Sequence, residues 1–142
     1  MAVALKHAVL DAEPEDGVRV LVDRMLPEGL SEAEMGLRGW LAALGPSREL
    51  SVWYDARPAQ WLLFRKKYLA ELNKEDALEA LAKLAEVAAQ KKRLTLVTAA
   101  GEPERSHAAV LRDLLSGARK PPATTGPARA ASAGRTRARR PR

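Results

Sequence analysis

Two polar strand ends are the parts of this sequence best suited to chemistry. The apolar run Val18–Val22 leads directly into an acid and a base, and the apolar run Leu94–Thr98 is followed shortly by a serine and a histidine. Runs of this kind are typical of buried strands, and polar residues beyond the carboxyl ends of such strands often form binding sites in α/β proteins. The candidate site residues are Asp23, Arg24, Ser106 and His107.

Asp23 and Arg24 could together hold an anionic ligand. Arg24 would present its planar guanidinium to a phosphate or carboxylate, and Asp23 would orient it or serve as a catalytic carboxylate. A structural alternative is also open, in which the pair forms an ion pair or anchors the following turn. Successive strand residues point to opposite faces, so the two side chains need not converge.

His107 is the other candidate for catalysis or ligand binding. It is expected just inside the last helix, where free backbone N–H groups favour anions and an imidazole could donate to a ligand or move a proton. Ser106 is a candidate hydrogen-bond donor to the same ligand, but neighbouring helix residues point about 100° apart, which makes a Ser–His nucleophile unfavourable. The alternative is a capping or partly buried histidine with a hydrogen-bonded ring.

The composition excludes several kinds of site. The chain of 142 residues has no cysteine and two histidines, which excludes disulfides, thiolate chemistry and a multi-histidine zinc site. We expect no metal and no cofactor. No apolar run approaches membrane-spanning length and the N-terminus lacks a signal-peptide layout, so we expect a cytoplasmic protein without a membrane partner.

The positive charge is concentrated at the C-terminus. Eight of the 24 basic residues lie in residues 119–142, which leaves 16 basic against 18 acidic residues in 1–118. We therefore predict a folded domain over 1–118 and a disordered Arg/Pro/Ala-rich tail over 119–142. Such a tail attracts nucleic acid weakly and without sequence readout. The tail residues expected to make this contact are Arg135, Arg137, Arg139, Arg140 and Arg142.

The hydrophobic pattern predicts an α/β fold with a small, mainly parallel sheet flanked by helices. Strands are expected over Val3–Val9, Val18–Val22 and Leu94–Ala99. Ser31 and Glu34 have the form of a capping box, and the apolar residues that follow predict a helix from there to about Leu44. Further helices are expected over part of 46–54, from about Pro58, from Asn73 to about Gln90, and from about Pro103.

The chain also resembles the YeaO-like family of small bacterial proteins, a domain of unknown function, from Val3 to about Leu115. The resemblance rests on the order and spacing of many landmarks rather than on one motif. These landmarks are Asp16-Gly17, Arg19 to Arg24, Pro27, Gly29, Trp40-Leu41, Pro46-Ser47, Leu50, Trp53, Trp61, Phe64, Tyr68, Glu71-Leu72, Thr95-Leu96, Ala99-Ala100, His107-Ala108 and Val110-Leu111. The resemblance implies a compact α/β fold and lends no activity.

Several polar positions depart from the pattern of the family. The family usually has Trp at Leu26, Arg at Glu28, Lys near Ala42 and a His-Asp pair at Ala56-Arg57, and more distant relatives carry cysteines near Thr98 and Ser106. These losses favour a ligand-free interaction or regulatory protein with a decayed pocket over an active catalyst. The function we expect is that of a small-anion-binding or partner-binding protein with a degenerate pocket. Two alternatives stay open: a nucleic-acid-associated protein acting through its tail, and an enzyme that uses Arg24 and His107 on a small anionic substrate.

Overall fold

The computed structural model describes residues 2–90 and 93–117. The contacts between residues divide the chain into two compact units, Met1–Arg112 and Asp113–Arg142. The boundary between them falls inside the last helix. The sheet, the first three helices and the candidate site belong to the first unit. The tail over 119–142 and its arginines lie outside the described residues, so the predicted domain boundary and tail disorder stay predictions.

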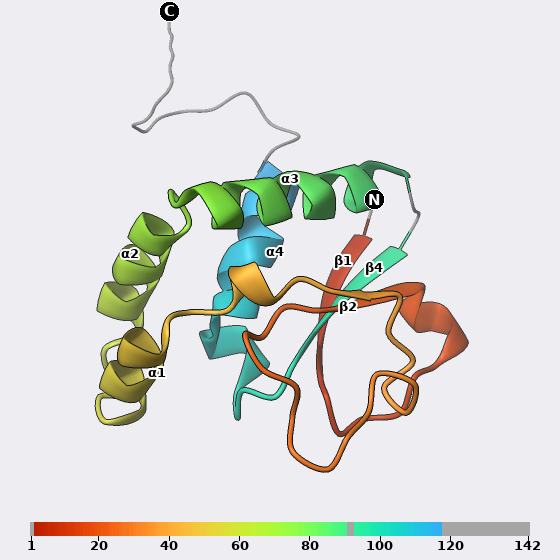
Figure 1. The fold of residues 1–142 in the computed structure, drawn as a ribbon, viewed down its shortest axis with the longest axis horizontal. Helices are drawn as coiled ribbons and strands as arrows, with labels where there is room; N and C mark the ends of the chain where they lie inside the picture. Colours follow the sequence, from red (N-terminus) through yellow and green to blue (C-terminus); the bar gives the residue numbers. More distant parts are fainter. Residues whose placement is uncertain (1, 91–92, 118–142) are drawn as a thin grey trace, which may run out of the picture. The chain divides into compact units, whose positions relative to one another are not determined.

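A parallel four-stranded sheet forms the centre of the first unit (Figure 1). Its strands are β1 (Ala2–His7), β2 (Val18–Leu21), β3 (Gly39–Trp40) and β4 (Arg93–Thr98), in the order β1-β4-β2-β3. All three pairings are parallel. The two central strands, β2 and β4, are the apolar runs of the sequence, as expected for strands covered on both faces. The predicted fold class, α/β with a mainly parallel sheet, is confirmed.

Four α-helices and three short 3-10 helices accompany the sheet. The α-helices are α1 (Arg48–Asp55), α2 (Trp61–Glu71), α3 (Glu75–Gln90) and α4 (His107–Gly117). The 3-10 helices are η1 (Pro14–Asp16), η2 (Ala42–Leu44) and η3 (Pro103–Arg105). Ser47 caps α1, because its hydroxyl accepts a hydrogen bond of 3.1 Å from the Leu50 N–H. The first three helices therefore fill the connection from β3 to β4, and α4 follows β4 through η3.

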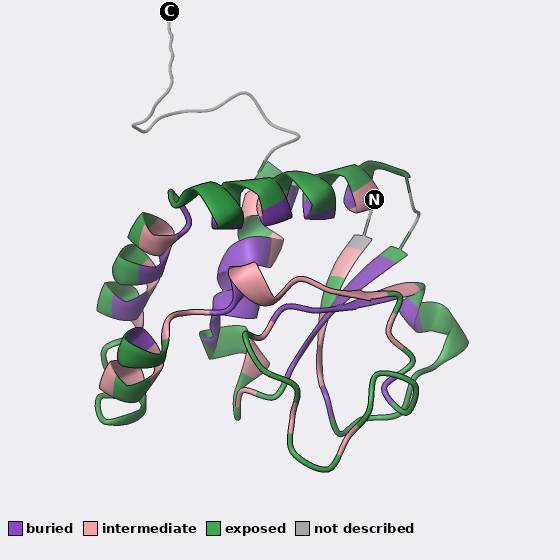
Figure 2. Cartoon of the chain, viewed as in Figure 1, coloured by how far each residue is buried: buried purple, intermediate pink, exposed green. Residues whose placement is uncertain are grey.

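The two faces of the sheet are covered differently. Leu21 and Val97 lie on one face and pack with Met35 from the connection between β2 and β3. Leu94 and Leu96 alternate to the opposite face and are fully buried, and α3 packs against their strand. The buried residues in Figure 2 accordingly run through the central strands, and the loops at their ends are largely exposed. The irregular β2–β3 connection is therefore part of the core, not merely a linker.

The helix expected over residues 31–44 is absent, and that prediction is wrong. The capping box forms, with the Ser31 N–H and the Glu34 N–H each donating to the side chain of the other residue. The turn ends at Gly36, whose φ of 62° suits glycine and terminates a helix. Beyond it the Arg38 N–H donates to the Arg19 carbonyl, and the chain joins the sheet as β3. Pairing with β2 therefore takes precedence over local helix propensity here.

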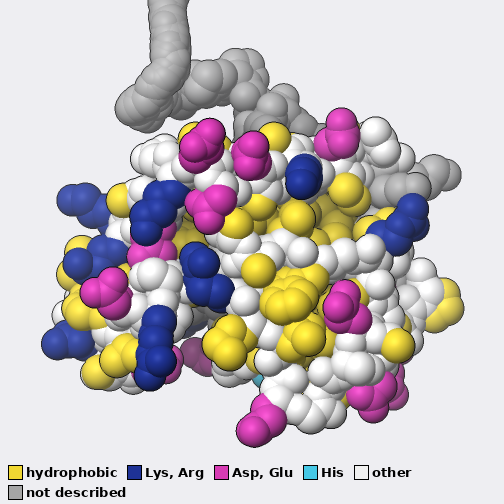
Figure 3. Space-filling view, viewed as in Figure 1, with side chains coloured by type: hydrophobic (Ala, Val, Ile, Leu, Met, Phe, Trp, Pro, Cys, Tyr) yellow, Lys and Arg dark blue, Asp and Glu magenta, His cyan; other side chains and the backbone are white. Residues whose placement is uncertain are grey.

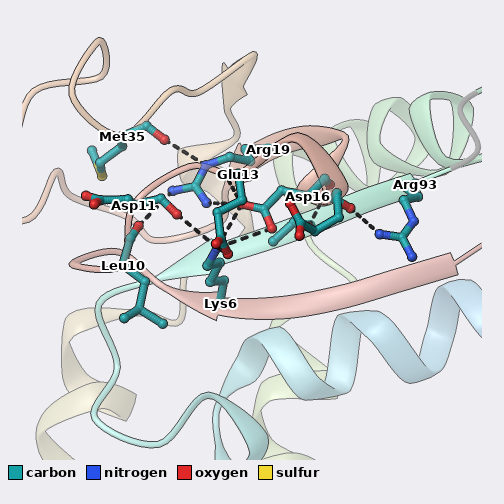
Figure 4. A network of polar contacts seen from close by, with 10 residues as sticks. Lys6, Leu10, Asp11, Glu13, Asp16, Arg19, Met35 and Arg93 are labelled. Atoms are coloured by element: carbon teal, nitrogen blue, oxygen red, sulfur yellow. Dashed lines mark hydrogen bonds and ion pairs between the residues drawn. The ribbon is translucent and has the colours of Figure 1, made fainter.

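A partly buried ionic cluster fastens the N-terminal loop to the sheet (Figure 4). The Arg19 side chain is 2% exposed and donates to Asp16 at 2.8 Å and to the Met35 carbonyl at 2.7 Å. Lys6 Nζ lies 3.0 Å from Asp16 and 2.9 Å from Glu13. Burial alone would raise the pKa of Asp16, but the Glu13 N–H, Lys6 and Arg19 together lower it below its ordinary value. We call Lys6, Glu13, Asp16 and Arg19 the Arg19 cluster.

Candidate functional site

A cavity of about 750 Å³ opens beyond the carboxyl ends of β2 and β4. Its walls come from residues 23–25 after β2, from residues 98–102 and 105–107 after β4, and from α1 and the start of α2. Adjacent parallel strands whose chains continue to different elements create such a crevice, which is the usual ligand site of open α/β sheets. All four candidate residues predicted from the sequence line this one cavity. We call it the β2–β4 cavity.

Asp23 is held firmly at the floor of the β2–β4 cavity. Its carboxylate accepts hydrogen bonds from the Thr98 hydroxyl at 2.6 Å and from the Ala99 N–H at 2.7 Å. Burial raises its pKa, but the hydrogen bond and charge of His107, with those two donors, lower it by more, so the net pKa lies below the ordinary value. Asp23 is therefore ionised at neutral pH and ties the end of β2 to the end of β4.

His107 joins Asp23 through one ring nitrogen. Its Nε2 lies 3.0 Å from the Asp23 carboxylate and 3.0 Å from the Val22 carbonyl, and both of those groups are acceptors. Nε2 must therefore carry a proton, which leaves Nδ1 as an acceptor when the ring is neutral. No described residue hydrogen-bonds to Nδ1. The imidazole is 5% exposed and meets the Tyr68 ring edge-on at 5.7 Å.

Tyr68 fixes the wall behind His107. Its hydroxyl donates to the Leu44 carbonyl at 2.6 Å, and burial raises the pKa of the phenol well above its usual range. The phenol is therefore neutral at neutral pH. It holds η2 against α2 and provides a rigid surface for the imidazole.

Arg24 lines the β2–β4 cavity and uses two of its five N–H donors on the backbone. Its Nη2 donates to the Gly45 carbonyl at 2.8 Å and its Nε to the Pro46 carbonyl at 3.3 Å. The backbones at Arg24 and Gly45 approach so closely that a Cβ added at Gly45 would lie 2.2 Å from the backbone nitrogen of Arg24. The structural alternative of a loop anchor therefore describes its contacts, and a ligand could use its three remaining N–H donors and its charge.

Ser106 acts as the cap of α4. Its hydroxyl donates to the Pro103 carbonyl at 2.7 Å and accepts from the Ala108 N–H at 3.2 Å. The residue is 3% exposed. Because its donor is already engaged, binding a ligand through Ser106 would require its hydroxyl to rotate away from Pro103.

Four charged side chains of the cavity wall were not singled out by sequence reasoning. They are Arg48 and Asp55 on α1, and Glu102 and Arg105 in and beside η3. Within residues 2–90 and 93–117, none of the four makes a side-chain hydrogen bond or ion pair. Each is an exposed residue in an ordinary amphipathic segment, so no local pattern distinguishes them from solvated charges. Only the fold, which brings α1 beside η3, assembles them.

Aromatic side chains form the apolar part of the cavity wall. Tyr54 and Phe64 both line it and stack on each other, with ring centroids 4.2 Å apart and an interplanar angle of 15°. The Tyr54 hydroxyl donates to the Arg105 carbonyl at 3.0 Å, which connects α1 to η3. An apolar wall with a few converging polar groups is the usual form of a small-molecule site.

The described part of the chain holds no group of three or more His, Asp and Glu side chains placed to bind a metal ion. No helix in the same residues is long and apolar enough to cross a membrane.

Comparison with known proteins identifies the family. The family model described as the inactive DUF488-N3 subclade matches residues 2–133. An uncharacterised protein of Mycobacterium tuberculosis is 40% identical over 107 residues, which are 75% of this chain and 87% of that protein. The uncharacterised protein YeaO of Escherichia coli is 35% identical over 115 residues, 81% of this chain and 97% of its own. No solved structure is significantly similar to this chain. The resemblance to the YeaO-like proteins is confirmed, and the chain belongs to the DUF488-N3i family, the inactive DUF488-N3 subclade.

Proposed function

We propose that the protein binds a small organic anion in the β2–β4 cavity and does not transform it. The observation that carries the proposal is that two guanidinium groups, Arg48 and Arg105, line the cavity without an ion-pair partner among the described residues. An arginine that faces a cavity and is free of carboxylates is available for bidentate contact with a carboxylate or phosphate. Lys and Arg side chains also gather on the side of the molecule formed by α1 and α2, which favours the approach of an anion (Figure 3).

Each residue predicted from the sequence has a role in this proposal. Arg24 contributes a fixed positive charge, because its bonds to two carbonyls hold its guanidinium at the wall. His107 offers Nδ1 as an acceptor, or as a donor when the ring is protonated. Asp23 keeps that ring in place, and Ser106 shapes the loop before α4.

The proposal that the protein does not transform its ligand rests on the hydrogen bonds of the Thr98 and Ser106 hydroxyls in the cavity. More distant relatives carry cysteines near Thr98 and Ser106. Both hydroxyls here donate to protein acceptors, Thr98 to Asp23 and Ser106 to Pro103. A nucleophile must reach its substrate and needs a base that takes its proton. Thr98 is fully buried, Ser106 is 3% exposed, and the Pro103 carbonyl that accepts from Ser106 is not a base. The description of the family as inactive supports the same proposal.

Thermal shift measurements on the full chain test this function. The panel consists of inorganic phosphate, benzoate, 3-phenylpropanoate and the neutral analogue 3-phenylpropan-1-ol, all at one ionic strength. A ligand at about a hundredfold its Kd stabilises a protein by about 2.7 kcal/mol, which gives a clear rise in Tm. We expect a rise with an aromatic carboxylate, none with the alcohol, and a smaller rise in an Arg48→Gln variant. Equal behaviour of acid and alcohol, or no response to any anion, would contradict the proposal.

A second candidate function rests on the composition of the tail. Its eight basic residues and lack of acids predict weak binding to nucleic acid through Arg135, Arg137, Arg139, Arg140 and Arg142. Fluorescence anisotropy with a single-stranded oligonucleotide should then give an affinity that falls steeply with salt. The affinity should disappear when the five arginines are changed to glutamine and persist in the Arg48→Gln variant. Binding that is insensitive to salt would contradict this candidate.

A further inference from the structure

We propose that the ligand of the β2–β4 cavity is a small zwitterion of the α-amino acid type with an aromatic or other apolar side chain. This inference rests on the proposed function and names the class of anion. It starts from the charges that remain available in the cavity once the internal contacts of the protein are made.

The available charges are of both signs. The side chains of Arg48 and Arg105 line the cavity without hydrogen bonds or ion pairs, and the same holds for those of Asp55 and Glu102 among the described residues. The other two charged groups of the wall are already engaged, since Asp23 holds His107 and Arg24 holds two backbone carbonyls. The free groups therefore sum to no net charge.

Each of the two segments contributes one free charge of each sign. Arg48 and Asp55 belong to α1, Arg105 is the last residue of η3, and Glu102 precedes η3. Although each pair lies on one segment, neither reaches the 4.0 Å that defines an ion pair. Both segments are joined directly by the hydrogen bond from the Tyr54 hydroxyl to the Arg105 carbonyl. Two guanidinium and two carboxylate groups thus surround one cavity without neutralising one another.

Electrostatics distinguishes between the possible ligands. A phosphate or dicarboxylate would gain from the two arginines but would be repelled by Asp55 and Glu102, so the net attraction would be small. A molecule with one carboxylate and one ammonium group can satisfy both kinds of side chain at once, because each charge meets its opposite. The stacked Tyr54 and Phe64 rings then provide the apolar surface for its side chain.

The size of the cavity agrees with such a ligand. A volume of about 750 Å³ is within the range of pockets that enclose small organic molecules, and it far exceeds the space that a lone inorganic ion needs. An aromatic amino acid is large enough to touch both the charged rim and the aromatic wall.

Isothermal titration calorimetry on the full chain tests the inference with three matched probes. L-Phenylalanine carries both charges, 3-phenylpropanoate lacks the amine, and 2-phenylethylamine lacks the carboxylate. We expect phenylalanine to bind at least about tenfold more tightly than either analogue, since a hydrogen bond between charged groups contributes at least that much. Asp55→Asn and Glu102→Gln should remove most of this advantage, whereas Glu49→Gln, an exposed acid of α1 outside the cavity wall, should retain it.

The outcomes separate this inference from the proposed function. Equal affinity for phenylalanine and 3-phenylpropanoate would overturn the zwitterion and leave anion binding in place. Preferential binding of 2-phenylethylamine would overturn both, because the site would then select cations. Failure of all three probes and of phosphate to bind would also overturn both.

Discussion

The Arg19 cluster and the β2–β4 cavity both gather charged side chains around the same two central strands, but they use them in opposite ways. In the Arg19 cluster every charge contacts another charge or a backbone carbonyl of the protein. In the β2–β4 cavity Asp23 and Arg24 are engaged in this way, whereas Arg48 and Arg105 contact none of the described acids. The comparison teaches that charges paired within the protein hold the fold, and that the proposed ligand rests on charges around a cavity that have no partner among the described residues.

The largest expected effect is on the Arg19 cluster. Arg19→Met should lower the free energy of unfolding by about 3–5 kcal/mol, because it leaves the buried Asp16 carboxylate short of a partner and the Met35 carbonyl without its donor. Urea denaturation measures the loss, with the exposed Arg38→Met as the matched control. If the two variants lost equal stability, the cluster would not be a structural element.

Asp23→Asn should have the next largest effect, a loss of about 2–3 kcal/mol at neutral pH, since the charged acceptor for His107 and Ala99 N–H disappears. The folded protein lowers the pKa of Asp23, so its contribution is complete above the unfolded pKa of about 3.9 and is lost as the pH falls through the lowered folded value. The stability difference between wild type and variant, followed by denaturation from neutral to acidic pH, should therefore shrink below about pH 4. A difference that is constant or grows in acid would contradict this role.

Arg24→Ala should cost about 1–2 kcal/mol, because the carbonyls of Gly45 and Pro46 lose a charged donor at the edge of the cavity. This variant tests the difference between Arg24, which is bonded to backbone carbonyls, and Arg48 and Arg105, which line the same cavity without partners among the described residues. Thermal denaturation should place it clearly below Arg48→Ala. If Arg24→Ala were as stable as the wild type, its contacts to the backbone would have no structural weight and it would belong with the ligand-binding arginines.

The smallest effect on stability is expected from the unpaired arginines. Arg48→Ala and Arg105→Ala should each change the free energy of unfolding by less than about 0.5 kcal/mol, as for exposed side chains without partners. Urea denaturation under the same conditions provides the measurement. A loss above about 1 kcal/mol would mean that these side chains make stabilising contacts and are not free for a ligand.

Sequence reasoning succeeded where the pattern is local or follows from a general rule of parallel sheets. The apolar runs before Asp23 and before Ser106 predicted the central strands, and the rule that polar residues gather beyond such strands placed Asp23, Arg24, Ser106 and His107 around one cavity. Whether these residues bind a ligand stays a prediction.

Sequence reasoning failed where distant residues decide the conformation. Residues 31–44 have a helical pattern, but two hydrogen bonds to Arg19 hold this segment at the sheet instead. The Arg19 side chain donates to the Met35 carbonyl, and the Arg38 N–H donates to the Arg19 carbonyl. Arg48 and Arg105 were missed for a similar reason, since each is an ordinary exposed cation until the fold places it at the cavity wall. Contacts between residues far apart in the sequence leave no mark on local periodicity.

Calorimetric titration of 3-phenylpropanoate into the full chain and into the Arg48→Gln/Arg105→Gln double variant tests the central claim most directly. The account predicts saturable binding to the wild type and at least about a hundredfold weaker binding to the double variant, since each lost charged contact accounts for about tenfold. The stability of the double variant should match that of the wild type. Equal affinity in the two proteins would contradict the claim that the unpaired arginines of the β2–β4 cavity are there for a ligand.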